Sequence, residues 1–457
     1  MTPLSSHRAT ISVLACLGFL LILPTQTWSQ VDASAQEADS GTVEEAPLEA
    51  PPPVSGSAYD TDFTTETESN YLRGGLTIAG AYSNNVAGSA SNPIGGPSYS
   101  LWPTITFDKT TIRGHYLVNY SPGFTFYPHT SALNQGNQNV AADLRYRLSP
   151  NVTVSLVESL QKTSNIFNQP TPLSTTVVSG SAPTPVQAVV PPVDNQLSNS
   201  ANAQLTYQLD ASSMVGAAGT FASLHFSNPV EAAGLSNSSS VAGSAFYSRR
   251  LLDKYSVGAN YQFQNIDSTE PGTQSLTNTH TQTQTIFFFL SILLKPTLSL
   301  SLSVGPQYFT SSQGQLPTVA SWSPLMMASV GWQGARTSLA ASYSRMATAA
   351  AGLNGVFQSN SVNVSARWQM ARTWIGGLAG SYGLYRTLTP SFVLTSSGGD
   401  TVTGTASVEH TVGEHLRAGI GYSWVKQSYS GSTAISNYPN TSRAYISISY
   451  TFSRPLQ

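Results

Sequence analysis

The residues of this chain that could perform acid–base or nucleophilic chemistry are few and scattered. Hydrolysis needs a nucleophile and a base brought together, usually serine with histidine or an activated water. His7 lies in the N-terminal apolar segment, and the other six histidines have no catalytic motif beside them. The chain also lacks a phosphate-binding glycine loop, a zinc-ligand spacing and a calcium loop. We therefore predict a protein that is not an enzyme and holds no cofactor.

The densest group of possible metal ligands is formed by Glu409, His410, Glu414 and His415. Four such side chains around one turn could approach a single metal ion. Successive residues of a strand point to opposite faces, however, which separates Glu409 from His410. Glutamate and histidine are also ordinary polar residues for an exposed turn. We predict no metal site here.

Beyond residue 71 the chain alternates apolar and polar residues with a period of two, which places one set on each face of a strand. In Thr297 to Val304 the even positions are leucine or valine, and the odd positions are threonine or serine. The same alternation recurs near residues 201–209, 361–368 and 401–409. These runs predict strands with one apolar and one wet face.

Charged residues on the wet face predict the character of an interior. Alternation assigns seven of them to it: Asp143, Arg145, Arg147, Arg367, Glu409, Arg417 and Arg443. A lumen lined in this way is mildly cationic and favours anions, because a charged wall concentrates ions of opposite charge. The alternative is that these arginines pair with carboxylates and only stiffen the wall.

The connections between alternating runs are short and long in turn. Eight tight turns are expected near residues 108–110, 149–151, 210–212, 252–254, 295–296, 334–336, 371–372 and 412–415. Nine longer polar stretches lie between them, near residues 84–98, 128–136, 162–195, 228–236, 268–278, 311–320, 347–354, 389–399 and 429–439. Together they connect about eighteen strands, an even number with both ends on the periplasmic side. The predicted fold is all-β, a transmembrane antiparallel up-and-down β-barrel.

Two further features separate such a barrel from a soluble β-sandwich. A sandwich has no reason to segregate its short turns to one end, and only 9% of these residues are charged against roughly 25% in soluble domains. Aromatic residues near strand ends are typical of girdles at the two membrane interfaces. The expected girdle residues are Trp102, Trp322, Trp332, Trp374, Trp424 and Tyr450.

Three regions are expected along the chain. Residues 1–29 form a signal peptide, with an apolar core from Ala9 to Leu23, cleaved after Ser29 or after Ala35. Residues 30–70 form a disordered periplasmic linker, with ten acidic and no basic residues between Asp32 and Glu68. Residues 71–457 form the barrel, whose 19 basic and 12 acidic residues are too evenly balanced to indicate nucleic-acid binding.

Short motifs of strand and turn add a family resemblance. The segment 75–86 containing Ala81 to Val86, the segment 116–127 containing Ser121 to Gly123, and the segment 144–150 resemble outer-membrane β-barrel porins that are sometimes encoded beside exopolysaccharide export systems. The resemblance implies the outer membrane, its lipid and polysaccharide export components as partners. The outward residues of the last run, from Ala444 to Phe452, resemble the segment recognised by the barrel-assembly machinery.

Two functions follow from these observations. The first is a channel for passive diffusion or export of small polar solutes or polysaccharide, because eighteen strands leave a water-filled bore. The second is a structural or adhesive barrel that displays its loops without an open pore. The longest loop, Lys162 to Asn195, is a further candidate for a pore constriction, and deleting residues 168–190 should then raise conductance.

Overall fold

The computed structural model describes residues 70–86, 93–163, 195–227, 235–252, 254–269, 278–314, 317–349, 356–388, 398–430 and 440–456. Within them lie eighteen β-strands and one 3-10 helix, η1 (Ser131–Leu133). The strands are β1 (Tyr71–Ser83), β2 (Gly96–Thr110), β3 (Gly114–Phe126), β4 (Gln135–Ser149), β5 (Val152–Thr163), β6 (Gln196–Gln208), β7 (Ser213–Phe226), β8 (Asn237–Leu252), β9 (Tyr255–Thr269), β10 (Thr279–Lys295), β11 (Leu298–Gln313), β12 (Val319–Gln333), β13 (Thr337–Ala349), β14 (Val356–Ala371), β15 (Trp374–Thr387), β16 (Gly398–Val412), β17 (Leu416–Ser430) and β18 (Thr441–Pro455). The signal peptide and linker predicted for residues 1–70 lie outside this part of the chain, apart from Asn70.

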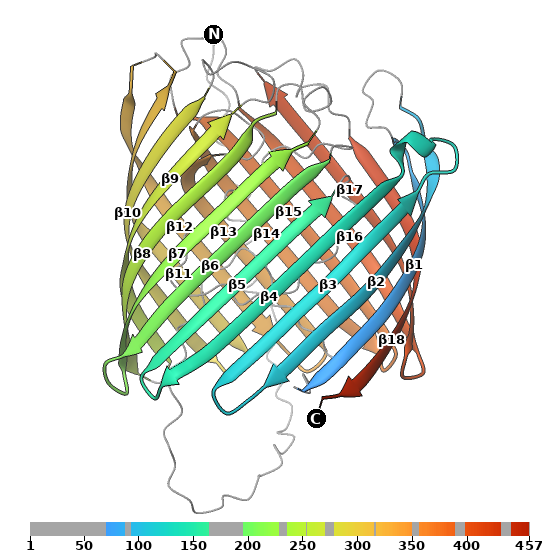
Figure 1. The fold of residues 1–457 in the computed structure, drawn as a ribbon, viewed down its shortest axis with the longest axis horizontal. Coiled ribbons are helices and arrows are strands. Elements are labelled where there is room, and N and C mark those ends of the chain that lie inside the picture. The colour runs from blue at the N-terminus through green and yellow to red at the C-terminus, as the bar shows by residue number, and fades with distance from the viewer. Residues whose placement is uncertain are drawn as a thin grey trace, which may run out of the picture. The chain divides into compact units, whose positions relative to one another are not determined.

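The strands form one closed antiparallel sheet. Each strand pairs with the next along the chain, and β1 pairs with both β2 and β18 (Figure 1). At the closing pair, Tyr71 lies opposite Pro455 and Ser83 lies opposite Arg443. The predicted fold class and strand number are confirmed.

The short turns all lie at one end of the barrel, which we call the turn side, and the strand ends that the long connections join lie at the other, the loop side (Figure 1). Four hairpins carry an irregularity in register beside their turn, for example between Arg147 and Ser149. Such bulges are common where a short turn reverses twisted strands. The segregation of turns by length is the feature that the sequence predicted.

The first turn was predicted wrongly, three residues too early. β2 continues through Asp108 to Thr110, and the turn occupies residues 111–113. Asp108 stays in the ladder opposite Leu117, and the Thr111 hydroxyl donates a hydrogen bond of 3.1 Å to the Gly114 carbonyl. The aspartate and lysine that indicated a turn are therefore strand residues, because the hydroxyl of Thr111 closes the reversal further on.

Exposure separates the outward face of the wall from the inward face. On β11 the outward Leu302 and Val304 are 42% and 47% exposed, while the inward Ser301 and Ser303 are 4% and 2% exposed. On β18 the outward Ile446 and Ile448 are likewise more than half exposed. An apolar band of this kind requires an apolar solvent, since large exposed apolar patches are rare on soluble monomers.

Among the described residues, no helix has the length and hydropathy needed to span a bilayer. Most of the largest fully buried apolar side chains lie instead on strands from β7 to β14, and Phe309, Phe357 and Leu325 are among them. Two compact apolar clusters form on the inner side of this region. The buried core of the barrel is therefore local and one-sided.

Aromatic rings cover inward glycines of neighbouring strands. A Cβ atom added to Gly123 would overlap the ring of Trp102. The same arrangement joins four other pairs: Gly216 with Phe246, Gly258 with Phe289, Gly399 with Tyr429, and Gly421 with Tyr445. Trp102 therefore faces into the barrel, and its predicted place in the membrane girdle was wrong. The reason is that Trp102 has the same strand parity as the inward Ser98 and Ser100.

Candidate pore lining

The inner wall is lined mainly by hydroxyl and amide side chains. β10 contributes Thr281, Thr283 and Thr285, and β9 contributes Gln262 and Gln264. Several hydroxyls bond to each other across strands, as Ser100 does to Thr125 at 3.0 Å and Ser381 does to Thr403 at 2.5 Å. This lining is polar and largely uncharged.

Inward arginines gather at the turn side. Each lies on the inward face within the five residues nearest the turn-side end of its strand. We call this set the arginine rim: Arg73, Arg145, Arg147, Arg250, Arg367 and Arg417. All six are exposed or half-exposed. The rim is therefore the accessible cationic part of the inner wall.

Four of the five arginines predicted to line the lumen lie in the rim. The fifth, Arg443, lies near the loop-side end of β18 and is only 8% exposed. Asp143 is inward on β4 and 9% exposed, so it lies further from solvent than Arg145 and Arg147 on the same strand. The predicted lining residues are thus divided between two heights of the barrel.

Carboxylates beside the rim lie close to basic side chains of neighbouring strands. Arg417 lies 3.6 Å from Glu409, and both side chains are about one third exposed. His115 lies 3.3 Å from the buried carboxylate of Asp108. Pairing of this kind lowers the charge that a passing ion meets, although the rim keeps an excess of cations.

Sequence reasoning missed four charged members of the inner wall: Arg73, Asp108, His115 and Arg250. The parity signal was present for Arg73, because it alternates with the outward Leu72 and Gly74. Arg250 has the same strand parity as the inward Phe246 and Ser248, and its guanidinium donates a 3.0 Å hydrogen bond to the Ala211 carbonyl. The parity signal was therefore present for this residue too.

The histidines of the possible metal cluster are separated. Glu409 faces inward to Arg417, whereas the ring of His410 lies 4.4 Å from that of Trp374 on the outward face. The ring of His415 lies 5.9 Å from that of Tyr450. Nowhere in the described ranges do three or more histidine, cysteine or acidic residues form a group that could hold a metal ion.

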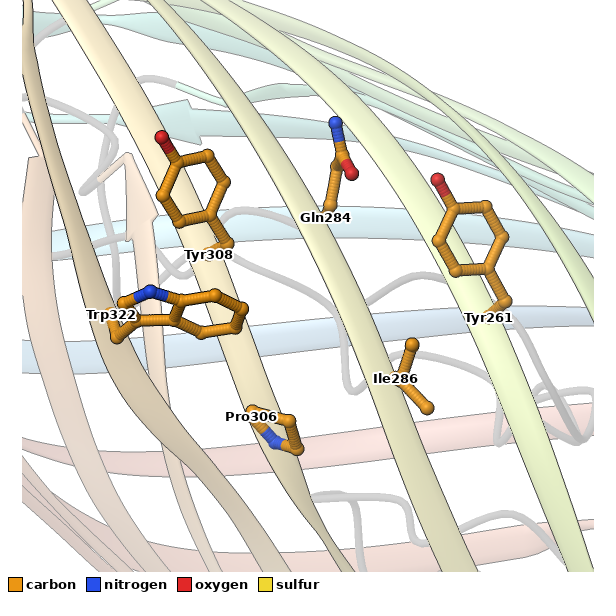
Figure 2. A pocket seen from close by; sticks show the side chains of 6 residues that line it. All are labelled: Tyr261, Gln284, Ile286, Pro306, Tyr308 and Trp322. Atoms are coloured by element: carbon orange, nitrogen blue, oxygen red, sulfur yellow. The ribbon is translucent and has the colours of Figure 1, made fainter.

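A shallow groove lies on the outer face, across β9 to β12. It is lined by Tyr261, Gln284, Ile286, Pro306, Tyr308 and Trp322. The rings of Tyr308 and Trp322 are 5.1 Å apart, and Trp322 is 68% exposed. Figure 2 shows the tyrosine hydroxyls and the Gln284 amide pointing to the same side of the groove. One polar and one apolar side suit the boundary between lipid headgroups and tails.

The closed barrel, its apolar outer band and its polar inner wall define a porin-like β-barrel of the bacterial outer membrane. The lipid of that membrane surrounds its outer face. No protein-family model and no curated protein matches the chain.

Solved structures of outer-membrane proteins are similar to it. The FrpB iron transporter of Neisseria meningitidis (F5-1 variant) is 11% identical over 79% of this chain and 63% of its own, with a TM-score of 0.40. This chain therefore spans less than two thirds of that transporter. OccK2 (OpdF) of Pseudomonas aeruginosa, solved with glucuronate, is 9% identical over 84% of this chain and 98% of its own, with a TM-score of 0.41. Likeness at this level carries no information on what this chain transports.

Proposed function

We propose that the protein is a passive channel for small polar solutes, with a modest preference for anions. The observation that carries this proposal is the arginine rim, in which six inward arginines are accessible at one mouth of a barrel with a polar lining. Fixed positive charge at a mouth raises the local concentration of anions and lowers that of cations. The uncharged wall beyond the rim exchanges hydrogen bonds with a hydrated solute without holding it.

Recordings in planar lipid bilayers test the proposal, and one strand offers a matched pair of variants. Arg250 faces inward at the end of β8, while its neighbour Arg249 faces outward in register with Ser213. Under a salt gradient, Arg250→Gln should shift the reversal potential toward weaker anion preference, because it removes a charge from the mouth. Arg249→Gln, which removes the same charge from the other face, should leave the reversal potential unchanged.

Wild-type protein that stays silent across salts and voltages would refute the channel. A conducting wild type in which both arginine variants behave alike would retain the channel but reject the rim as its source of selectivity.

An exported polysaccharide remains within this proposal as a larger cargo, with components of a polysaccharide export system as partners. Liposome swelling with uncharged oligosaccharides of increasing length measures which sizes pass. We also propose that the barrel-assembly machinery recognises the outward face of β18, which ends at Tyr450 and Phe452. Phe452→Ala should then slow membrane insertion more than Ser449→Ala, a change on the inward face of the same strand.

A surface-display barrel without an open pore is the second candidate. It is favoured by the burial of inward side chains on the loop side, where Thr125, Thr283 and Ser359 are each 1% exposed. Binding to cells or glycans by purified protein that does not conduct would support this candidate over the channel.

A further inference from the structure

The wall of the barrel is interrupted between β12 and β13. Their pairing runs from Gln333 opposite Ser338 to Met326 opposite Arg345 and stops there. Beyond this point β12 continues to Val319 beside β11, and β13 continues to Ala349 beside β14. The two strands therefore separate on the loop side while each keeps its other neighbour.

The end of β13 crosses the inner face of the wall as far as β11. The Gln307 amide, on the inward face of β11, donates a 2.9 Å hydrogen bond to the Ala347 carbonyl. Its carbonyl oxygen accepts a 2.8 Å bond from the Ala347 N–H. In an unbroken wall β12 would hold these strands about 10 Å apart, two strand spacings of ~4.8 Å. Ala347 thus lies on the inner side of β12. The side chain of Gln307 bonds to the backbone groups of Ala347 that β12 would otherwise pair with.

The end of β14 follows β13 inward. Gln358 shares the outward parity of Val364, yet its amide donates a hydrogen bond of 3.4 Å to the hydroxyl of the inward-facing Ser323 on β12. An outward residue of one strand meets an inward residue of another only if the first strand lies inside the second.

Apolar packing fills the space between the two layers. Phe287, Leu325 and Met346, from β10, β12 and β13, are each 5% exposed or less, and Phe289 and Met327 pack against them. A second cluster joins Phe309, Ala347 and Val356 and includes Leu388. Burial of this kind stabilises a fixed layer, because it removes large apolar side chains from water.

From these contacts we infer that residues 346–349 and 356–359 form a second layer inside the barrel that sets the size limit of the pore. The inference rests on the proposed channel. Packed sheets lie about 10 Å apart, so a second layer removes bore width on one side. Its described contacts with the wall are neutral. The layer therefore limits the size of a solute, while the arginine rim acts on its charge.

Replacing Gln307 tests the size limit. Gln307→Ala removes both bonds to Ala347 and leaves a buried backbone N–H and carbonyl unpaired, which favours release of the layer. Single-channel conductance should rise on the order of 1.5-fold, because current follows the open cross-section. Larger polyethylene glycols should enter, and the reversal potential should not move. The control is Gln204→Ala, another buried inward glutamine, on β6.

A conducting Gln307→Ala channel with wild-type conductance and wild-type polymer exclusion would overturn the inference. The channel proposal would survive that result. A wild-type protein that does not conduct would instead reject the channel proposal.

Cross-linking tests the position of the layer without any conduction. The only native cysteine is Cys16, in the predicted signal peptide. The double variant Ser323→Cys, Gln358→Cys should cross-link rapidly through a short bifunctional methanethiosulfonate. The double variant Ser323→Cys, Val364→Cys should not cross-link, because Val364 lies on the outer face, 45% exposed. Equal rates for the two pairs, or none for either, would place β14 in the wall and reject the layer.

Discussion

Gly305 lies against the backbone of the neighbouring strand β10. A Cβ atom there would overlap the Ile286 carbonyl oxygen and lie 2.6 Å from the Phe287 Cα. The register between β10 and β11 is the same on both sides of this point, with Thr285 opposite Gln307 and Phe288 opposite Val304. Only a residue without a side chain fits between strands at such a distance.

Gly305→Ala should therefore lower the free energy of unfolding by about 1–3 kcal/mol, the usual cost of forcing atoms into a packed site. Gly243→Ala is the control, because an added Cβ there meets nothing within 4 Å. Urea unfolding of the detergent-solubilised barrel measures the free energy of unfolding of both variants. Equal stability of the two variants would show that the backbones separate without cost.

The turn between β6 and β7 holds a carboxylate in its charged form. The hydroxyl and the backbone N–H of Ser212 each donate a 2.7 Å hydrogen bond to Asp210. These bonds lower the pKa of Asp210 below its ordinary 3.8, because they favour the ionised group. The stabilisation they give the turn is present above that ordinary value and is lost as the pH falls through the lowered pKa.

Carbon NMR titration of labelled aspartate should find Asp210 below 3.8, and Ser212→Ala should move its pKa upward toward that value. An unchanged pKa in the variant would mean that the hydroxyl bond contributes nothing.

At this scale the sequence predicted which way most side chains face but not what they touch. Alternation alone places Arg417 and Glu409 inward, yet their contact depends on the register of β16 against β17, which no local pattern records. The inward orientation of the Trp102 side chain was missed because aromatic residues were assigned to the membrane girdle by their place near strand ends rather than by strand parity. Counting from Ser98 would have found it.

At the scale of strands, the ion pair between Glu409 on β16 and Arg417 on β17 should affect ion selectivity more than the free energy of unfolding. With both side chains about one third exposed, it contributes only about 0–1 kcal/mol to stability. Its effect on ion selectivity is larger than its effect on stability, because the Glu409 carboxylate cancels one positive charge of the arginine rim.

Glu409→Gln should leave unfolding nearly unchanged and shift the reversal potential toward stronger anion preference. Arg417→Gln should shift it the opposite way. Glu158→Gln is the control, since Glu158 shares the outward face of β5 with Leu156 and Leu160. A shift of equal size in the control would point to the overall charge of the protein as the cause, not the pore.

The strands and their order were predictable because short and long connections alternate. The separation of β13 from β12 was not, since Ser344, Met346 and Thr348 continue the alternation of the strand without a break. Alternation describes the two faces of one strand and is silent about which neighbour it pairs with. Candidate loops such as residues 164–194 lie outside the described residues, so the predicted constriction by that loop stays a prediction.

For the whole molecule, closure of the sheet gives every strand two neighbours, and only the short loop-side separation of β12 from β13 leaves strand edges unpaired. Unheated protein in SDS should therefore stay folded and migrate faster than heated protein. Removing β18 should abolish the fast band, because β1 and β17 would each lose a partner. A fast band from the shortened chain would mean that seventeen strands close without it.

The pairing of β1 with β18 also imposes an order in time. β1 is synthesised before β18, yet the two strands pair with each other. Until β18 is in place, the sheet is open and one edge of β1 is unpaired. Such edges pair readily with any other extended chain. Until Pro455 pairs with Tyr71, the unpaired edge of β1 can therefore bind other extended chains.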